Sequence, residues 1–491
     1  MKKPLNYFSN SIIILITALF LQSHNKSVEN EFSQPNIIII FCDDLGYGDI
    51  GSFGATGFST PHIDQLATEG MQFTDFYSAQ AVCTASRASI LTGCYANRLS
   101  LSGALMPWAN KGLHKDEKTI AEILKEKGYA AGIFGKWHLG HQKEFLPLQH
   151  GFDEYVGLPY SNDMWPVDFA GNQITDTASW KFKYPQLPLI KNNDKIDEIR
   201  TLDDQSKLTA LYTDKATDFI KRNKNQPFFL YLPHSMPHVP IAASEKFKGK
   251  SKHGLYGDVI MEIDWSVGEI MNTLKENGLD KNTLVVFTSD NGPWLNFGNH
   301  AGSSGGLREG KGTSWEGGQK VPCVMRWPGV IPAGTVCNKL ASTIDLLPTI
   351  TSIVNGKLPE HKIDGVNILS LMKGDINAEP RNTFNYYYRR NNLEAIRKDH
   401  WKLVFPHEGR SYENQEPGKD GFSGPAPENI KTEMALFDLR RDPGERYDVQ
   451  KYYPDVVKEL MALADKVRED LGDDLKNIKG KNVRESGLVK E

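Results

Sequence analysis

The sequence lacks an excess of charge of either sign. Its 491 residues include 57 lysines and arginines against 61 aspartates and glutamates, which gives a formal net charge of −4. A nucleic-acid-binding chain would show a basic excess, so this balance argues against a nucleic-acid partner. The sequence shows no internal repeat and no low-complexity tract. A hydrophobic share of 39% with 24% charged residues is typical of a globular protein, here long enough for more than one domain.

The sequence also lacks a comfortable transmembrane segment, because the apolar run at 12–21 is too short to span a bilayer. This run follows Lys2 and Lys3 and precedes Ser23. A basic start, a short apolar run and a polar exit are typical of a secretory signal peptide. We therefore expect residues 1–23 to direct export to the periplasm or the extracellular space, with no stable membrane insertion. An uncleaved anchor is the alternative.

Cysteines are few, and their number is odd. Five cysteines in a chain of this length do not make a disulfide-stabilised scaffold. For an exported protein, an odd count indicates one thiol with a special role. Setting Cys83 aside leaves four, of which Cys323 and Cys337 could form a disulfide, although the sequence does not decide this.

Short runs of apolar and β-branched residues predict strands that are buried on both faces, as in a parallel sheet. The clearest are residues 36–42, 227–232 and 283–289. Amphipathic helices are expected at 205–222 and 256–277, where apolar residues recur at helical spacing. Strands that alternate with helices predict an α/β fold.

Oxygen-bearing side chains directly follow two of these strands. Asp43 and Asp44 come after the first strand, and Asp290 and Asn291 come after the third. Since sites in α/β sheets form at the carboxyl ends of strands, we expect the four side chains to share one hard cation. Oxygen donors suit Ca²⁺ or Mg²⁺ rather than zinc, and Ca²⁺ tolerates irregular geometry better than Mg²⁺. A lone Asp-Asp pair would more often be a turn or a helix cap.

The segment 83–87 predicts a polar turn that opens a short helix, which Gly93 closes. Cys83 would then lie at the helix N-terminus, with Arg87 on the same face four residues on. The helix dipole and a nearby guanidinium favour an activated thiol nucleophile. An ordinary buried cysteine is the alternative, with similar weight.

Further basic side chains lie in loops. Lys136 and His138 belong to a glycine-flanked loop after a short strand, and they share one side if the backbone stays extended. His238 follows the second buried strand, with His234 as a weaker candidate. Lys311 lies in a glycine-rich segment whose spacing does not match a phosphate-binding P-loop.

Together these motifs resemble those of the type I, formylglycine-dependent sulfatases of the alkaline-phosphatase-like superfamily. Cys83-Thr84-Ala85-Ser86-Arg87 is similar to their signature Cys-x-(Pro/Ala)-Ser-Arg, in which the cysteine is oxidised to formylglycine. The segment 135–140 (GKWHLG) resembles the second sulfatase signature. The segment 310–318 resembles a third sulfatase motif, Gly-Lys-Gly-(Thr/Ser)-x-(Trp/Tyr)-Glu-Gly-Gly. The motifs follow one another in the order found in the family.

The resemblance implies an alkaline-phosphatase-like fold. We expect a large, mostly parallel mixed sheet sandwiched by helices, with the catalytic sulfatase domain at 34–365. Beyond it, short strand patterns followed by an amphipathic helix predict a smaller C-terminal α+β subdomain at 380–480, which bears an antiparallel sheet.

The resemblance also implies a metal-assisted sulfuric ester hydrolase. One Ca²⁺, with Mg²⁺ less suitable, would be bound by Asp43, Asp44, Asp290 and Asn291 together with the formylglycine made from Cys83. The hydrated aldehyde at that position would attack sulfur, as the family implies.

The remaining catalytic roles follow from the same resemblance. Arg87 would position the hydrate, while Lys136, Lys311 and His238 hold the sulfate oxygens. Either His238 or Lys311 would protonate the leaving alcohol. His138 would take the proton of the geminal hydroxyl, so that sulfate leaves and the aldehyde is regenerated.

The substrate is indicated by a long insert at 141–204, which we expect to be irregular and to line a pocket. Trp108, Trp165 and Trp294 are candidate platforms for a sugar ring, and Asp163 is a candidate acceptor from sugar hydroxyls. A sulfated polysaccharide or oligosaccharide is therefore the expected substrate.

Two other functions remain open on the sequence. A phosphodiesterase or phosphonate hydrolase would use the same scaffold, and it is distinguished by its turnover of phosphate esters. An unconverted Cys83 would leave a non-catalytic protein that binds sulfated glycans. Conversion itself requires a partner, either a formylglycine-generating enzyme or an anaerobic sulfatase-maturating enzyme.

Overall fold

The computed structural model describes Met1 and residues 34–489. The predicted signal peptide at 1–23 therefore lies, apart from Met1, outside the described residues. In the part of the chain that the structure describes, no helix is long and apolar enough to cross a membrane.

A 10-stranded mixed sheet forms the centre of the molecule. Its five middle strands, β10, β1, β9, β5 and β6, run parallel, and antiparallel neighbours extend the sheet at both sides. The predicted large, mostly parallel mixed sheet is thus confirmed. In spatial order the strands are β12 (Thr335–Cys337), β2 (Met71–Phe73), β11 (Cys323–Arg326), β10 (Thr283–Ser289), β1 (Asn36–Cys42), β9 (Phe228–Pro233), β5 (Ala130–Phe134), β6 (Glu154–Gly157), β7 (Leu187–Lys191) and β8 (Asp194–Ile199).

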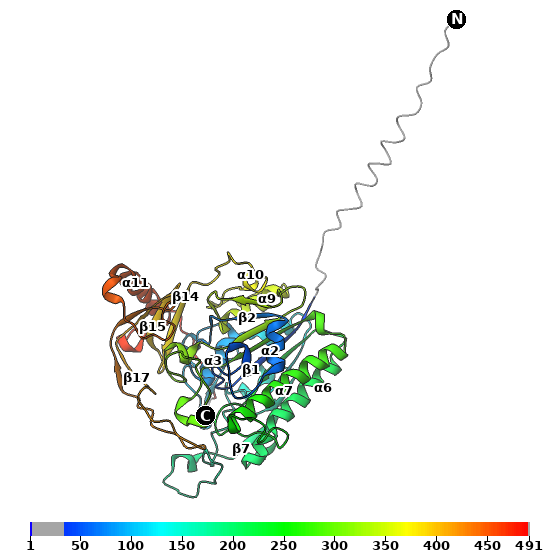
Figure 1. The fold of residues 1–491 in the computed structure, drawn as a ribbon. Coiled ribbons are helices and arrows are strands. Elements are labelled where there is room, and N and C mark those ends of the chain that lie inside the picture. The colour runs from blue at the N-terminus through cyan, green and yellow to red at the C-terminus, as the bar shows by residue number, and fades with distance from the viewer. Residues whose placement is uncertain (2–33, 490–491) are drawn as a thin grey trace. The chain divides into compact units, whose positions relative to one another are not determined.

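Helices cover both faces of this sheet. Alternate side chains of β1 point to opposite faces, and they belong to two separate hydrophobic cores. Ile37 and Ile39 pack in the core that contains the helices α3 (Cys83–Thr92), α4 (Ile120–Lys125), α9 (Leu346–Ile353) and α10 (Leu369–Met372). Ile38 and Ile40 pack in the core that contains the helices α2 (Pro61–Thr68), α6 (Leu208–Arg222) and α7 (Gly254–Glu276). Figure 1 shows α6 and α7 on the opposite side of the sheet from α9 and α10.

The segment 141–204 differs from its prediction as an irregular insert. It contains β6 and the hairpin β7–β8, which extend the main sheet, followed by the short helix α5 (Leu202–Ser206). The outermost strand β8 is largely exposed and carries the charged sequence DKIDEI. An edge strand that faces solvent lacks the apolar pattern of a buried strand, so the sequence pattern did not predict β8.

The disulfide between Cys323 and Cys337 that the sequence left open is not formed. β11 and β12 flank β2 on opposite sides, and both cysteines lie in register with Phe73. Two strand spacings separate them by about 9.5 Å, which is beyond the reach of a disulfide. Both cysteines are free and buried.

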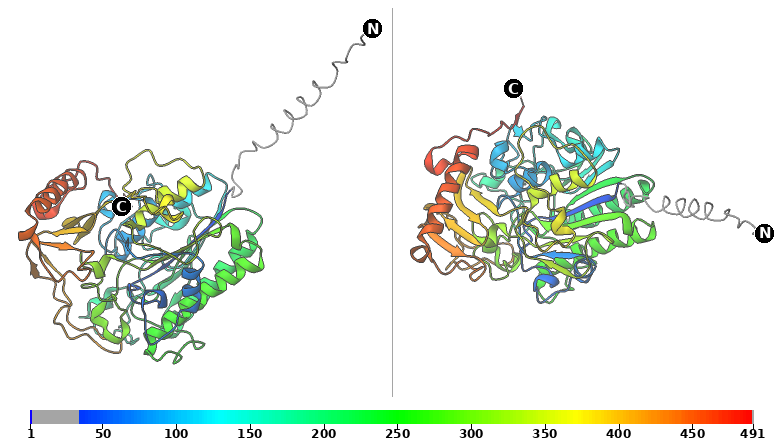
Figure 2. Two further views of the ribbon diagram at one scale, coloured as in Figure 1. Left: turned by 45° about the horizontal axis from the view of Figure 1, so that its top comes forward. Right: turned by 90° about the horizontal axis from the view of Figure 1, so that it is seen from above.

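A second, antiparallel sheet follows in the C-terminal part of the chain, as predicted. Its four strands are β14 (Thr383–Tyr388), β15 (Asn392–Lys398), β16 (Trp401–Val404) and β19 (Ala435–Asp438), and α11 (Pro454–Leu471) packs on them. Figure 2 shows this sheet and α11 in orange and red beside the main sheet. Small two-stranded pairs complete the fold: β3 (Phe76–Tyr77) with β13 (Ala341–Ser342), β4 (Lys111–Gly112) with β20 (Gly487–Leu488), and β17 (His407–Gly409) with β18 (Ile430–Thr432).

A buried ion-pair network joins the C-terminal sheet to the glycine-rich segment 310–318, which leads into α8 (Glu316–Gln319). The ammonium group of Lys402 on β16 lies 2.7 Å from Glu445 and 3.3 Å from Glu316, and it donates to the carbonyl of Ser314. All three charged side chains are fully or almost fully buried. Tyr386 on β14 donates to Glu316 as well.

We predict that Lys402→Ala lowers the free energy of unfolding by about 3–5 kcal/mol, because it leaves two buried carboxylates without a counterion. Urea unfolding followed by circular dichroism measures this loss. Lys466→Ala, a change at an exposed position on α11, is the matched control and should shift stability by less than about 0.5 kcal/mol. Equal losses of unfolding free energy in the two variants would show that this network does not stabilise the contact between the C-terminal sheet and the segment 310–318.

Candidate active site

Two strand ends bring the predicted oxygen ligands together. β1 and β10 are parallel neighbours in which Cys42 pairs with Ser289, so the residues that follow each strand lie side by side. The amide of Asp44 donates to Oδ1 of Asp290 at 3.0 Å. Asp43, Asp44, Asp290 and Asn291 are all buried, as expected for a site rather than a surface turn.

The donor set fits a divalent cation. Single ligand atoms of Asp43, Asp44, Cys83 and His238 all lie within 4.8 Å of one another. The amide nitrogen of Asn291 donates to Asp44 at 2.7 Å and to the Gly292 carbonyl at 2.9 Å, while its Oδ1 is buried without a hydrogen-bond partner. A buried amide oxygen without a donor, beside carboxylates, is what a hard cation would satisfy. The group of four includes His238, which was not predicted as a ligand, while Asp290 and Asn291 adjoin it through their hydrogen bonds with Asp44, so the predicted ligand set stays a prediction.

Cys83 lies at the first position of α3, as predicted, and Gly93 ends that helix in the left-handed conformation with φ 70°. The sulfur lies 3.6 Å from Oδ1 of Asp43 and 3.6 Å from Nζ of Lys311. Burial raises the pKa of the thiol to about 12, although Lys136 and Lys311 act to lower it. Burial therefore acts against the activated thiol that the sequence suggested, since desolvation disfavours the thiolate while the nearby cations favour it.

Two buried cations hold the carboxylates in place. Nη2 of Arg87 lies 2.9 Å from Asp290 and 3.3 Å from Asp43, while Nη1 donates to the carbonyl of Lys136. The ammonium group of Lys136 donates to Asp43 at 2.5 Å and to Ser161 at 3.0 Å. Burial alone would raise the pKa of Asp43, but Lys136, together with His238 and Arg87, holds it well below its usual range.

The two histidines and Lys311 meet at one cavity. His138 has φ 63°, so a left-handed turn, and not the extended alternation assumed from sequence, places its ring there. Its Nε2 lies 2.8 Å from the Leu105 carbonyl. His238 Nε2 lies 3.6 Å from Asp44, and Lys311 Nζ lies 2.8 Å from the same carboxylate. The weaker candidate His234 is buried beside Ser266, outside the cavity lining.

The cavity has a volume of about 280 Å³ and also contains residues that the sequence did not predict. Ser161 and three arginines lie in its wall beside the predicted Cys83, His138, His238 and Lys311; these arginines are Arg389, Arg390 and Arg410. Arg389 and Arg390 are adjacent in the sequence and lie between two segments with strand patterns. A search for hairpin turns would have placed them in the turn.

Comparison with known families decides the identity. The sulfatase family model matches residues 35–356, and the model for the C-terminal region of aryl-sulfatase matches residues 379–488. The chain belongs to the sulfatase family. A third model, the C-terminal region of N-sulphoglucosamine sulphohydrolase, matches residues 310–413. The protein is thus a sulfuric ester hydrolase with the metal-dependent site of its family.

Relatives of this sulfatase cover nearly the whole chain. It is 38% identical to arylsulfatase A of Bos taurus over 87% of this chain and 86% of the relative. It is 36% identical to N-acetylgalactosamine-6-sulfatase of Mus musculus over 89% of this chain and 86% of the relative. The crystal structure of the PsFucS1 sulfatase from Pseudoalteromonas sp. superposes with a TM-score of 0.78 at 28% identity, covering 88% of this chain and 90% of that one.

The three tryptophans of this sulfatase that were predicted as sugar platforms occupy different environments. Trp165 is fully buried, so that prediction is wrong, because its ring belongs to the core that also contains residues of α2, α6 and α7. Trp294 is half-buried and lines the cavity. Trp108 is 59% exposed and stacks on Tyr184 with ring centroids 5.2 Å apart.

We predict that a divalent cation raises the thermal unfolding midpoint of chelator-treated sulfatase, because it offsets the repulsion among the three buried carboxylates. Asn291→Leu removes one oxygen donor and should weaken this binding by at least about tenfold. Differential scanning calorimetry over a titration with metal measures the effect. Asn382→Leu, at an exposed position, is the control. If both variants retain the full midpoint shift, Asn291 is not a ligand.

Proposed function

We propose that this sulfatase removes sulfate from a sulfated polysaccharide or oligosaccharide, with Cys83 converted to formylglycine and one bound Ca²⁺. The observation that carries the proposal is the place of Cys83. It lies at the base of a small cavity, within 3.6 Å of both Asp43 and Lys311. A residue at position 83 therefore contacts both a proposed metal ligand, Asp43, and a cation that can bind the substrate sulfate, Lys311.

The ligands of the proposed Ca²⁺ are Asp43, Asp44, Asp290, Asn291 and an oxygen of the modified Cys83. When bound, the ion polarises the sulfate oxygens and lowers the pKa of the hydrated aldehyde. Ca²⁺ suits this set better than Mg²⁺, which demands near-octahedral geometry and keeps several waters. Arg87 has a positioning role, since it holds Asp43 and Asp290 at fixed distances.

The hydrogen bonds of the histidines support their proposed roles. A carbonyl only accepts, so His138 must donate from Nε2 to Leu105, which leaves Nδ1 as a base; Nδ1 is buried without a partner. This Nδ1 takes the proton of the geminal hydroxyl. His238 likewise donates from Nδ1 to the Val239 carbonyl at 2.6 Å, and its Nε2 faces Asp44.

The sulfate group is held by cations that already lie at the site. Lys311 and His238 line the cavity, and Lys136 lies behind them on Asp43. Burial alone would lower the pKa of Lys311, but Asp44 and other nearby groups raise it overall, so the side chain is a firm cation. His238 Nε2 lies 3.6 Å from the Asp44 carboxylate, so a proton on that nitrogen makes His238 the second candidate donor to the leaving alcohol beside Lys311.

Sugar recognition is proposed from the same cavity. Oδ1 of Asp163 is buried without a hydrogen-bond partner and lines the cavity, so it can accept from a sugar hydroxyl. Trp294 packs against both catalytic cations, with Lys311 Nζ 4.5 Å from its ring centroid. The name of the N-acetylgalactosamine-6-sulfatase relative gives a sulfated amino sugar as one model substrate.

Cellular context completes the proposal. The protein is exported through residues 1–23 to the periplasm or the extracellular space, and a formylglycine-generating or anaerobic sulfatase-maturating enzyme converts Cys83. The proposed boundaries remain 34–365 for the catalytic domain and 380–480 for the C-terminal subdomain.

The first test is the mass of the peptide that contains Cys83, taken from protein exported by its native host. Trypsin needs a second protease beside it, because no lysine or arginine lies between Lys26 and Arg87. A residue lighter than cysteine that is trapped as a hydrazone supports the proposal. An unmodified thiol would remove the nucleophile and favour a glycan-binding protein.

The second test is activity. We predict that Cys83→Ala lowers kcat/KM for a sulfate ester by at least about 10³-fold, since a nucleophile that acts as part of a unit carries most of the rate. Release of sulfate from N-acetylgalactosamine 6-sulfate and from 4-nitrophenyl sulfate measures this. Cys94→Ala, at another buried cysteine, is the control. Faster hydrolysis of 4-nitrophenyl phosphate than of the sulfate would instead indicate a phosphoesterase.

A further inference from the structure

Three arginines of the C-terminal part form one wall of the catalytic cavity. Arg389 and Arg390 occupy the turn between β14 and β15, and Arg410 directly follows β17. They line the same cavity as Cys83 and Lys311. None of the three is used in the sulfate chemistry described above.

These guanidinium groups outnumber their counterions. Glu428, which is 47% exposed, serves both Arg389, at 2.7 Å, and Arg410, whose Nε donates to it at 2.6 Å. Arg390 is exposed and forms no ion pair within residues 34–489. Within the described residues the three arginines therefore share one ion-pair partner, the partly solvated carboxylate of Glu428.

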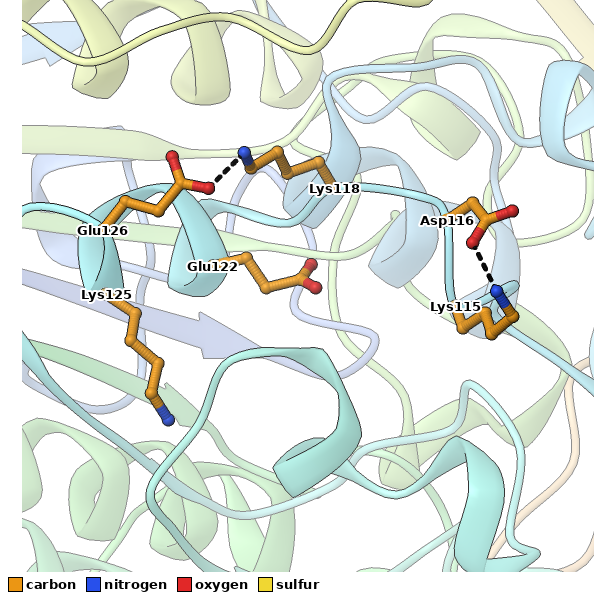
Figure 3. A pocket seen from close by; sticks show the side chains of 6 residues that line it. All are labelled: Lys115, Asp116, Lys118, Glu122, Lys125 and Glu126. Carbon is orange, nitrogen blue, oxygen red and sulfur yellow. Dashed lines mark hydrogen bonds and ion pairs between the residues drawn. The ribbon is translucent and has the colours of Figure 1, made fainter.

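A second pocket, on another part of the surface, also contains several cationic side chains, but their charges are balanced (Figure 3). Its lysines each have an acidic partner: Lys115 pairs with Asp116 and Lys118 with Glu126, as drawn, and Lys125 pairs with Asp153, which is not drawn. Lysines that are paired one to one leave no excess charge for a ligand. The arginine wall differs because its charge is not balanced.

The backbone of the turn is held in an unfavourable conformation. Arg389 has φ 46° and Arg390 has φ 68°, in the left-handed region that glycine or asparagine normally fills in hairpin turns. Each such residue costs on the order of 1 kcal/mol. Gln80 donates to the carbonyl of Arg390 and Asn97 donates to the side chain of Asn391, so the main domain braces the turn from two sides.

Arg410 lies directly against the catalytic segment. A Cβ on Gly312 would come within 2.6 Å of Nη1 of Arg410, and Gly312 has φ 76°, in the left-handed region that favours glycine. Tyr412 donates to the carbonyl of Lys311 at 2.6 Å, which ties the same loop to the residue that faces the scissile group. The arginine wall and the sulfate-binding lysine are thus parts of one rigid arrangement.

We propose that Arg389, Arg390 and Arg410 form an accessory anion site, which binds a second sulfate or carboxylate group on the same saccharide that carries the scissile sulfate. The proposal rests on the proposed function and narrows its substrate class to multiply anionic glycans. Guanidinium groups suit this task, because their planar donors match sulfate and carboxylate oxygens. Glu428 holds Arg389 and Arg410 in the free protein and gives way to the incoming anion.

The test measures binding and does not require turnover. Titration calorimetry on Ca²⁺-loaded Cys83→Ala protein compares glucose 6-sulfate, which has one anionic group, with sucrose octasulfate, which has many. We expect the polysulfated probe to bind at least tenfold more tightly. Adding Arg390→Ala should weaken binding of sucrose octasulfate about tenfold and leave binding of glucose 6-sulfate unchanged, since the substitution removes a charged hydrogen-bond donor that only the polysulfated probe reaches.

Further variants separate a specific site from general charge. Arg390→Lys should recover part of the lost affinity, and Glu428→Gln should strengthen binding of the polysulfated probe. Arg441→Ala, at an exposed arginine outside the cavity lining, is the matched control and should change neither affinity. Glucuronic acid 2-sulfate, which carries one sulfate ester and one carboxylate, then shows whether a carboxylate can replace the second sulfate.

The outcomes distinguish the two proposals. Equal affinity for the two probes, or equal losses in the Arg390 and Arg441 variants, would overturn the accessory site. Loss of sulfate release with an intact preference for the polysulfated probe would instead overturn the catalytic proposal alone.

Discussion

The burial of three carboxylates at two adjacent strand ends is the constraint on which the site depends. Asp43, Asp44 and Asp290 lie within hydrogen-bond reach of one another or of shared partners, in a region that water does not solvate. Such charge is tolerable only when it is paired and hydrogen-bonded. Arg87 and Lys136, which are both fully buried, form ion pairs with Asp290 and Asp43 and so neutralise part of this charge. The remaining side of the carboxylates faces the cavity, which is where a divalent cation and an anionic substrate can complete the neutralisation.

The sequence predicted these parts because each of them is local. A buried strand followed by Asp-Asp or Asp-Asn can be recognised within ten residues, and parallel pairing then brings the two ends together without further information. Where prediction failed, the reason lay in distant packing. Trp165 is covered by other parts of the fold, and β8 is a charged edge strand without a buried pattern. The ring of His138 depends on a left-handed backbone that alternation cannot anticipate.

The arginine wall was missed for a related reason. Its members lie more than 250 residues from Cys83 in the sequence, and only the packing of the C-terminal sheet on the segment 310–318 brings them to the cavity. That packing joins a hydrophobic contact to an electrostatic one: Trp315 of the segment packs in the core of the C-terminal sheet, and Lys402 neutralises Glu316 and Glu445 at the junction. The same contact that stabilises the fold therefore sets the position of the residues proposed to select the substrate.

This arrangement separates the chemistry of the site from its selectivity. The proposed metal ligands and the cations paired with them are buried and mutually bonded, and they follow strands of the central sheet, so a change in any one of them disturbs the others. Arg390 is exposed, unpaired within the described residues and located in a short turn, so it can change with little effect on the buried charges. A turn of the C-terminal sheet can therefore alter which sulfated glycan is bound, while the strand ends that act on the sulfate group stay the same.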